Sequence, residues 1–274
     1  MASLREIKDH IGSVRSTLKI TSAMKLVSSA KLRKAQQAVE TMRPYQQELE
    51  RMLEAIGGIG STPVQEETEN HGKLAIVAIA SNSSLCGAFN GNVVRKVQEM
   101  VAQAGGPEHV EVFAVGRKVG GTDLNDLVAH PDYAKSQELA SILVDGYNSG
   151  RFSRVILVYN HFFSTSSQKV VAETYLPLQG AGYENSQDLY SGDYILEPGR
   201  EAILKDLLPQ VIRLKLYAAI LDSVAAEHAA RMIAMQAATD NAEDLLAELS
   251  LEDNKGRQAK ITAEILDLVA GARQ

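Results

Sequence analysis

The chain has 274 residues, which is enough for one large domain or two ordinary ones. Its composition, 45% hydrophobic and 23% charged, is typical of a soluble globular protein and excludes the collagen-like and disordered classes. The net charge of −6 counts against nucleic acid as the main partner, because such binding needs a basic surface. A single cysteine excludes an intramolecular disulfide and a cysteine-rich zinc site.

The sequence carries no segment that is expected to enter a membrane. No run approaches the roughly 18 apolar residues that a spanning helix needs. The first residues, MASLREIKDHIGSVRS, lack the apolar core of a secretory signal, and the early acids Glu6 and Asp9 argue against an organelle transit peptide. We therefore expect a chain that lies in the cytosol or is held at a membrane through a partner.

Proline and glycine divide the chain into three parts. All seven prolines lie between residues 44 and 209, while 1–43 contain one glycine and 210–274 contain two. Since these residues concentrate where turns are needed, the two ends are predicted to be long helices and the middle a mixed domain. The predicted parts are an N-terminal helix over 1–58, a domain over 72–198 and a C-terminal helix over 200–274.

The N-terminal part shows a heptad pattern, with small or apolar residues at alternating steps of three and four. Its seam positions are Leu4, Ile7, Ile11, Val14, Leu18, Thr21, Lys25, Ser28, Leu32, Ala35, Val39, Met42, Gln46, Leu49, Leu53 and Ile56. Pro44 falls inside this run and is expected to kink or loosen the helix. Lys25 and Ser28 interrupt the seam, so this stretch either faces something other than its partner helix or is a solvated weak spot.

The C-terminal part repeats the same steps. Its seam positions are Leu204, Leu207, Val211, Leu214, Ala218, Leu221, Ala225, His228, Met232, Met235, Thr239, Ala242, Leu246 and Leu249. After Leu249 the phase slips, and the seam is expected to resume at Ile261, Ile265 and Leu268. Two matching seams at opposite ends predict a long antiparallel coiled coil with the middle domain inserted. The alternative is that each helix packs on the middle domain as an ordinary helix.

Charge favours contact between the two ends. Residues 1–56 carry ten Lys and Arg against six Asp and Glu, a net charge of +4, whereas 201–274 carry a net charge of −4. Residues 10–39 hold six basic residues and no acid. These are Arg15, Lys19, Lys25, Lys31, Arg33 and Lys34. Such a run is either a solvated face or a surface that meets an acidic partner.

Short apolar runs alternate with helical patterns in the middle of the chain. Strands are predicted over 73–80, 110–116, 154–162, 169–178 and 194–198, and helices over 91–104 and 136–148. Alternation of this kind predicts a mainly parallel, Rossmann-like α/β domain. The predicted fold class is therefore α/β, a terminal antiparallel coiled coil with an inserted α/β domain.

A search for catalytic chemistry finds none. The phosphate-binding pattern G-x-x-x-x-G-K-[ST] and the dinucleotide pattern G-x-G-x-x-G are both absent. No histidine pairs at helical spacing with another histidine or with Cys86, and H-E-x-x-H is absent. Cys86 has no candidate base near it in sequence. We therefore predict no catalytic, cofactor-binding or metal-binding residues, and we do not expect an enzyme that acts alone.

Several strings resemble the gamma-subunit family of the rotary, or F-type, ATP synthase. They are LKITSAMKLVSSAKLRKAQ and RPY in the N-terminal part, SLCGAFN in the middle, and AAEHAARMIAMQAATDNAEDLL and NKGRQAKITAEILDLVAGA in the C-terminal part. The resemblance implies a non-catalytic rotor shaft inside a ring of three alpha and three beta subunits. It also implies a foot domain that binds the epsilon subunit and the membrane c-ring, and a shaft whose rotation sets the state of each catalytic beta subunit.

The resemblance further implies a peripheral protein on the cytoplasmic face of the bacterial inner membrane, and five contacts with beta subunits. Met24 and Lys25 match the family's upper shaft, while Arg257, Gln258 and Thr262 match its C-terminal contact segment. Arginine suits such a contact because its planar fork can grip carboxylates or carbonyls.

Two positions depart from the family pattern. Asn82-Ser83-Ser84 stands where D-R-G is usual, which puts a charge contact by that loop in doubt. Gly256 stands where alanine is common, and a glycine inside a helix costs about 1 kcal/mol relative to alanine.

Two other protein classes remain as alternatives. One is a coiled-coil scaffold that presents an α/β binding domain. The other is a small-molecule-binding α/β protein or enzyme with its ligand in the crevice at 81–90.

Overall fold

The computed structural model describes residues 4–56, 72–120, 124–178 and 197–271. The long terminal helices are α1 (Leu4–Ala55) and α5 (Arg200–Gly271). The elements between them are β1 (Lys73–Ile79), α2 (Phe89–Gln103), η1 (Pro107–His109), β2 (Val110–Val115), η2 (Arg117–Val119), α3 (Asp126–Ala129), α4 (Tyr133–Asn148), β3 (Phe152–Ser164) and β4 (Ser167–Leu176).

The chain forms two compact units. Met1–Ser29 and Arg231–Gln274 make up the first, called the shaft unit below, and Ala30–Ala230 make up the second, called the sheet unit. The domain boundary expected at residue 58 lies outside the described residues, and that expected at 198 adjoins residues that are outside them. The three-part division of the sequence therefore stays a prediction.

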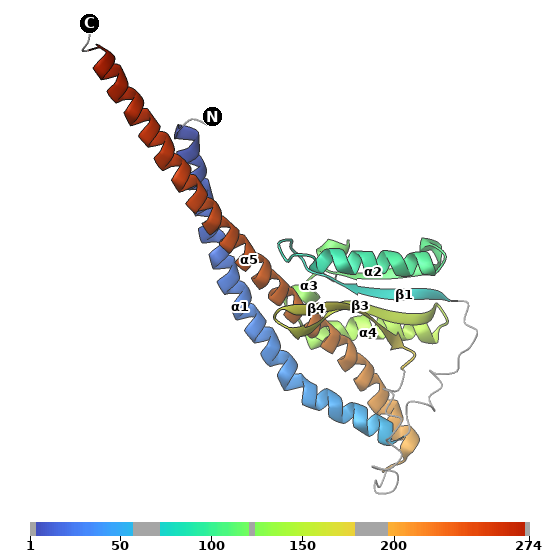
Figure 1. The fold of residues 1–274 in the computed structure, drawn as a ribbon. Coiled ribbons are helices and arrows are strands. Elements are labelled where there is room, and N and C mark those ends of the chain that lie inside the picture. The colour runs from blue at the N-terminus through green and yellow to red at the C-terminus, as the bar shows by residue number, and fades with distance from the viewer. Residues whose placement is uncertain (1–3, 57–71, 121–123, 179–196, 272–274) are drawn as a thin grey trace. The chain divides into compact units, whose positions relative to one another are not determined.

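In the shaft unit α1 and α5 pack antiparallel along the predicted seam (Figure 1). One cluster of buried residues joins Val14 to Ala242 and Leu249, with Ile11 and Leu18 packed against it. None of the eight predicted seam positions of α1 in the shaft unit, from Leu4 to Ser28, is exposed, including the polar ones. Periodic burial of this kind is the signature of helices that share an apolar stripe, so the predicted antiparallel pairing is confirmed.

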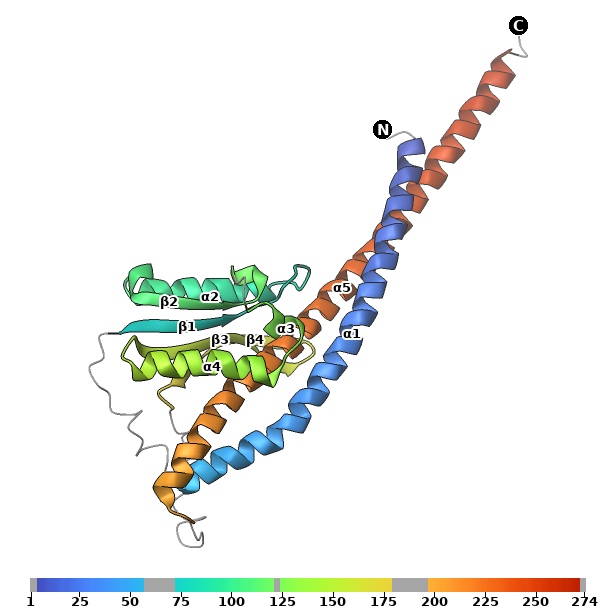
Figure 2. The ribbon, with the colours of Figure 1, turned by 180° about the vertical axis from the view of Figure 1, so that it is seen from behind.

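The seam past Leu249 differs from the prediction. It continues without a phase slip through Asp253 and Gly256, which are both half-buried. A Cβ atom at Gly256 would lie 2.8 Å from Cδ2 of Leu4, so glycine permits a close approach there. The prediction that the seam resumes at three later residues is wrong, because α5 continues past the described start of α1 (Figure 2). Those residues, Ile261, Ile265 and Leu268, are exposed.

The sheet unit contains a four-stranded sheet in the order β2-β1-β3-β4. Strand β1 pairs in parallel with β2 and β3, and β4 pairs antiparallel with β3. The predicted, mainly parallel α/β domain is thus confirmed. Of the fifth predicted strand, residues 194–196 lie outside the described residues, and Glu197 and Pro198 are not in a strand.

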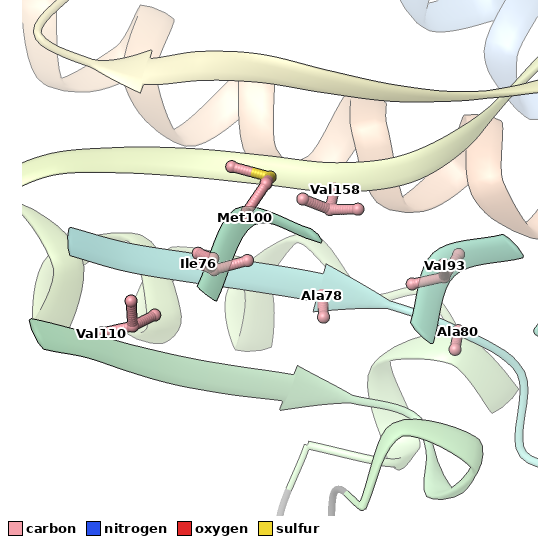
Figure 3. Packing of buried hydrophobic residues seen from close by; sticks show 7 residues of the cluster. All are labelled: Ile76, Ala78, Ala80, Val93, Met100, Val110 and Val158. Carbon is pink, nitrogen blue, oxygen red and sulfur yellow. The ribbon is translucent and has the colours of Figure 1, made fainter. Parts of the chain in front are cut away.

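Helices cover both faces of the sheet, with α2 on one side and α4 on the other (Figure 1). One apolar core lies between α2 and the sheet (Figure 3). Its residues are Ile76, Ala78, Ala80, Val93, Met100, Val110 and Val158. Every second residue of β1 belongs to this cluster, as expected from the alternation of side chains along a strand.

Helix α5 also contributes to the core of the sheet unit. Leu216, Ile220 and Ala226 are fully buried there. The N-terminal half of α5 thus packs on the sheet, and its C-terminal part pairs with α1 in the shaft unit. Both alternatives that the sequence left open, a coiled-coil helix and a helix packed on the middle domain, therefore apply to different parts of α5. Helix α1 continues through Pro44 as a single helix. It curves over the second half of its length (Figure 1).

Candidate functional site

The five predicted contact residues lie in two separate zones of the shaft unit. Met24 and Lys25 are half-buried on α1, close to the level at which Thr21 contacts Thr239. The segment that begins at Arg257 starts where Gly256 approaches Leu4. With a helical rise of 1.5 Å per residue, about 25 Å separates Thr239 from Gly256 along α5. The five residues therefore cannot form one site.

The first zone is an exposed surface of α1, called the α1 face below and made up of Lys19, Ile20, Leu26 and Val27. Ile20, Leu26 and Val27 are 60%, 70% and 56% exposed. Exposed side chains of this size on a helix next to basic residues are typical of an interaction surface.

The seam pattern alone did not indicate the α1 face. In the stretch from Thr21 to Ser28 the three seam positions are polar, whereas Met24, Leu26 and Val27 lie off the seam. Thr21 and Ser28 are nevertheless buried, at 8% and 3% exposure, so the seam still faces inward. Ser28 is therefore not a solvated weak spot, whereas Lys25 is half-buried, so the interpretation that this stretch faces something other than the partner helix stays a prediction. The feature of the sequence that could have indicated a partner surface is the group of apolar residues at positions off the seam, Ile20, Leu26 and Val27.

The basic residues of this zone are available to a partner. Among the described residues, Arg15, Lys19 and Lys25 form no ion pair with a carboxylate. Positive charge that is not neutralised within the chain attracts an acidic surface and speeds its association.

The second zone is the part of α5 beyond Gly256, called the α5 overhang below. Arg257, Gln258 and Thr262 are exposed, as contact residues should be. Arg257 Nη2 lies 3.5 Å from Asn254 Oδ1, and the Thr262 hydroxyl donates to the Gln258 carbonyl at 2.9 Å. Neither bond leaves the helix. Four large apolar side chains share this overhang and are also exposed, namely Ile261, Ile265, Leu266 and Leu268.

The loop at Ser81–Asn90 follows β1, where a ligand would bind in many α/β proteins. Its polar groups bond within the protein instead. Asn90 Oδ1 accepts from both the backbone amide and the hydroxyl of Ser81, each at 3.0 Å. Cys86 is 1% exposed and accepts a hydrogen bond from Asn90 Nδ2 at 3.1 Å. Among the described residues, the polar contacts of the thiol are with Ser81, Ser83 and Asn90.

Asn82, which stands at a departure from the family pattern, has a structural role. Its side-chain amide donates to the Asn125 carbonyl at 2.8 Å, and its Oδ1 accepts from the Arg117 amide at 3.1 Å. Gly116 makes the second bond possible, because its φ of +108° is strained for any other residue and a Cβ there would collide with the Ala80 carbonyl. Asn82 thus joins three neighbouring loops.

A polar network in the sheet unit links the sheet to α5. His161 Nδ1 contacts Asp222 Oδ2, while Asp222 Oδ1 accepts from the Phe162 amide at 3.3 Å. Burial raises the pKa of Asp222, and the hydrogen bond from His161 opposes that rise. Lys215 Nζ lies 2.8 Å from Glu173 Oε1. These groups line a cavity of about 520 Å³.

The opposite wall of this cavity comes from α1, including Val39, Met42 and Arg43. Tyr159 also lines it, and its hydroxyl donates to Glu173 Oε2 at 3.1 Å. Burial raises the pKa of Tyr159, and the Glu173 carboxylate adds to the rise. Tyr159 therefore stays a neutral hydrogen-bond donor at physiological pH.

Within the described ranges, no three His, Cys, Asp or Glu side chains are arranged to hold a metal ion. The same residues include no helix with a stretch apolar enough to cross a bilayer.

Comparison with known proteins gives concordant matches over the whole chain. A family model described as ATP synthase matches residues 3–273. The ATP synthase gamma chain of Bacteroides thetaiotaomicron is 42% identical over 299 residues, covering 100% of both chains. That of Flavobacterium johnsoniae is 41% identical over 289 residues, covering 99% of this chain and 98% of the relative.

Two solved structures of the Euglena gracilis mitochondrial ATP synthase contain a chain of similar fold. The match in the rotor in rotational state 1 has a TM-score of 0.64 at 22% identity and covers 94% of this chain and 98% of the other. The match in the OSCP/F1/c-ring assembly in rotational state 3 has a TM-score of 0.67 at 23% identity, with coverages of 98% and 93%.

Proposed function

The chain belongs to the ATP synthase gamma-chain family, and we propose from this premise that it is the rotating shaft of the complex, coupling rotation to the catalytic beta subunits. The shaft would turn inside a ring of three alpha and three beta subunits while protons cross the membrane. Because it is asymmetric, it would contact each beta subunit differently, and each turn would shift the conformational equilibrium of every beta subunit in sequence. Such a shift changes nucleotide affinity only if contacts with the two conformers differ in free energy.

The observation that supports this proposal most is the α1 face. Ile20, Leu26 and Val27 are exposed although they are large and apolar, and Lys19 has no acidic partner within the described residues. A shaft surface that meets acidic beta-subunit segments would have this composition. Apolar and basic side chains also suit contacts that must form and break at each step of rotation, because such contacts do not depend on a network of directional hydrogen bonds.

The α5 overhang supports a second contact with the beta subunits. We assign Arg257, Gln258 and Thr262 to that contact, together with Met24 and Lys25 on α1. The apolar residues Ile261, Ile265, Leu266 and Leu268 are exposed in this chain and would be covered by the surrounding subunits. Burying side chains of this kind contributes about 1.5–3 kcal/mol each, which favours assembly.

The remaining assignments follow from the family alone. The sheet unit would bind the epsilon subunit and the membrane c-ring, so the chain would be a peripheral subunit on the cytoplasmic face of the bacterial membrane. ATP chemistry would take place in the beta subunits, with no catalytic residue and no cofactor in this chain. The absence of a phosphate-binding glycine loop after β1 agrees with that division of roles.

Co-expression with the cognate alpha and beta subunits tests the proposal. We expect a complex with one copy of this chain for each three alpha–beta pairs, and faster Mg-ATP hydrolysis than alpha and beta show without it. The contrary result is a chain that fails to co-purify and forms a stable oligomer alone, with no effect on hydrolysis. That result would favour a coiled-coil scaffold that presents an α/β binding domain.

A further inference from the structure

Two polar side-chain pairs join the sheet to α5 at separate points. Glu173 on β4 pairs with Lys215 at 2.8 Å, and His161 on β3 contacts Asp222. Lys215 and Asp222 are seven residues apart, so they lie on one side of α5 about 10 Å from each other. We propose that these two pairs fasten the sheet to α5 and transmit torque between the sheet and α5. This inference rests on the proposed function, and it names the residues that position the sheet on the shaft helix for that function.

Each attachment is reinforced by a second bond from the same side chain. Lys215 Nζ also donates to the Thr174 carbonyl at 3.5 Å, and Asp222 also accepts from the Phe162 amide at 3.3 Å. Lys215 and Asp222 are the less exposed partners, with side chains 18% and 13% exposed. Partly buried, charge-assisted bonds are stronger and hold their geometry better than exposed ion pairs, which contribute little.

The arrangement resists rotation in a way that one contact cannot. A single contact leaves a helix able to pivot about it, whereas two contacts on one side fix both its position and its direction. The charges also alternate, because α5 presents a cation at Lys215 and an anion at Asp222. Sliding α5 by two turns would place Lys215 next to His161, which lacks negative charge, so the alternation also selects the register.

A cavity of about 520 Å³ lies beside these pairs. Glu173, Lys215, His161 and Asp222 form one wall of it, and residues of α1 between Val39 and Leu53 form the opposite wall. The apolar contact of α5 with the sheet unit is made by other residues, including the fully buried Leu216 and Ile220. One further bond supports the attachment to α5 on the same strand as Glu173, since the buried Tyr175 hydroxyl donates to the Ile212 carbonyl at 2.9 Å.

The test measures the stiffness of the link in the assembled complex. A bead is attached through Gln98→Cys on the exposed side of α2, the alpha–beta ring is fixed to a surface, and angular fluctuations are recorded without nucleotide. We expect the angular variance to rise for Lys215→Gln and for Asp222→Asn, and to rise further for both together. The exchanged pair Glu173→Lys with Lys215→Glu should bring the variance part of the way back to the wild-type value, because it restores the ion pair but not the bond from position 215 to the Thr174 carbonyl.

Lys135→Gln is the matched control. It breaks a lysine–carboxylate pair of the same length, 2.8 Å, but its partner Asp126 lies on α3, and the pair does not reach α5. It should leave the variance unchanged. Thermal unfolding of each complex is measured in parallel, because a purely structural role would lower the unfolding temperature without changing the variance.

A second readout is local. The Phe162 amide should exchange with deuterium about fivefold faster in Asp222→Asn, because its acceptor loses its charge. Unchanged variance in a complex that assembles and hydrolyses ATP would overturn the attachment proposal and leave the proposed function intact. Failure of the wild-type chain to assemble would instead overturn the proposed function.

Discussion

The hydroxyl of Thr239 on α5 donates a hydrogen bond to the hydroxyl of Thr21 on α1 at 2.9 Å, across 218 positions of sequence. Both residues are 8% exposed and both occupy seam positions. The bond places one hydrogen-bonded polar layer inside a mainly apolar seam. A polar layer of this kind fixes the register of two helices at some cost in stability, because only one alignment satisfies both hydroxyls.

Replacing one threonine of this layer by valine should cost little. The Thr21 hydroxyl donates to the Leu18 carbonyl at 3.1 Å, and the Met235 carbonyl, 2.8 Å from the Thr239 hydroxyl, is an alternative acceptor for the single proton of that hydroxyl. The remaining hydroxyl therefore keeps an acceptor within its own helix. We expect each single variant to lower the free energy of unfolding by about 1 kcal/mol, and the double variant to regain part of that loss. Urea unfolding of the full chain measures this. Strictly additive losses would show that the two hydroxyls do not interact.

Gly256→Ala should stabilise the chain. Alanine gains about 1 kcal/mol over glycine inside a helix. The added Cβ would meet the Leu4 side chain, at 2.8 Å from Cδ2 and 3.5 Å from Cγ, and the end of a half-buried leucine side chain can move. The midpoint of thermal unfolding should therefore rise. A fall would mean that the close approach of α5 to Leu4 contributes more than helix propensity does.

Lys25→Glu should weaken coupling between rotation and hydrolysis. The variant puts an acid into the acid-free basic run, so it would repel an acidic partner, and the effect should be largest at low salt, where charges are least screened. Lys73→Glu is the control, because Lys73 is an exposed lysine on β1 of the sheet unit. The measurement is Mg-ATP hydrolysis by the assembled complex against salt. Equal effects of the two variants would contradict a specific role for Lys25.

Arg257→Ala combined with Gln258→Ala should impair turnover or assembly while leaving the isolated chain folded. Both side chains are exposed and neither bonds outside α5 in the described structure, so their loss removes no fold contact. Circular dichroism of the isolated chain and hydrolysis by the complex separate the two effects. If folding alone suffers, the assignment of a beta-subunit contact to this segment is wrong.

Asp222→Asn should change how stability depends on pH. Burial raises the pKa of Asp222 above its usual 3.8, so the folded chain holds this proton to higher pH than the unfolded chain does. The stability of the wild type relative to the variant should therefore fall as pH rises from 3.8 through the raised folded pKa. Groups that face Asp222 are His161, Arg43 and Tyr159, and they are unchanged in the variant. A difference that stays constant across this window would contradict the raised pKa.

The sequence predicted the helical pairing and the sheet because both have a strong period. Steps of three and four located the seam of α1 even at Lys25 and Ser28, which are not apolar, since neighbouring seam residues determine the face. The near-continuous apolar run of β1 identified a strand buried on both faces. The strand at β4 was predicted, but its antiparallel direction was not. That direction and the exposure of the end of α5 depend on where neighbouring elements stop, which the local sequence pattern does not encode.

The polar attachments could not be predicted from the sequence for the same reason. His161 and Asp222 lie 61 positions apart, and each alone looks like an ordinary surface residue. Their contact depends on how the end of β3 meets one turn of α5. Asn82 was recognised only as a departure from a family pattern, and its bonds to two other loops became visible in three dimensions.

Direct observation of rotation tests the central proposal. With the alpha–beta ring fixed and a bead on Gln98→Cys, the bead should turn in one direction when Mg-ATP is added and stop when it is removed. Substituting Lys25→Glu should slow or disrupt that motion at low salt, and Lys73→Glu should not. A bead that shows only undirected fluctuation, in a complex that hydrolyses ATP at the full rate, would contradict the rotor-shaft function.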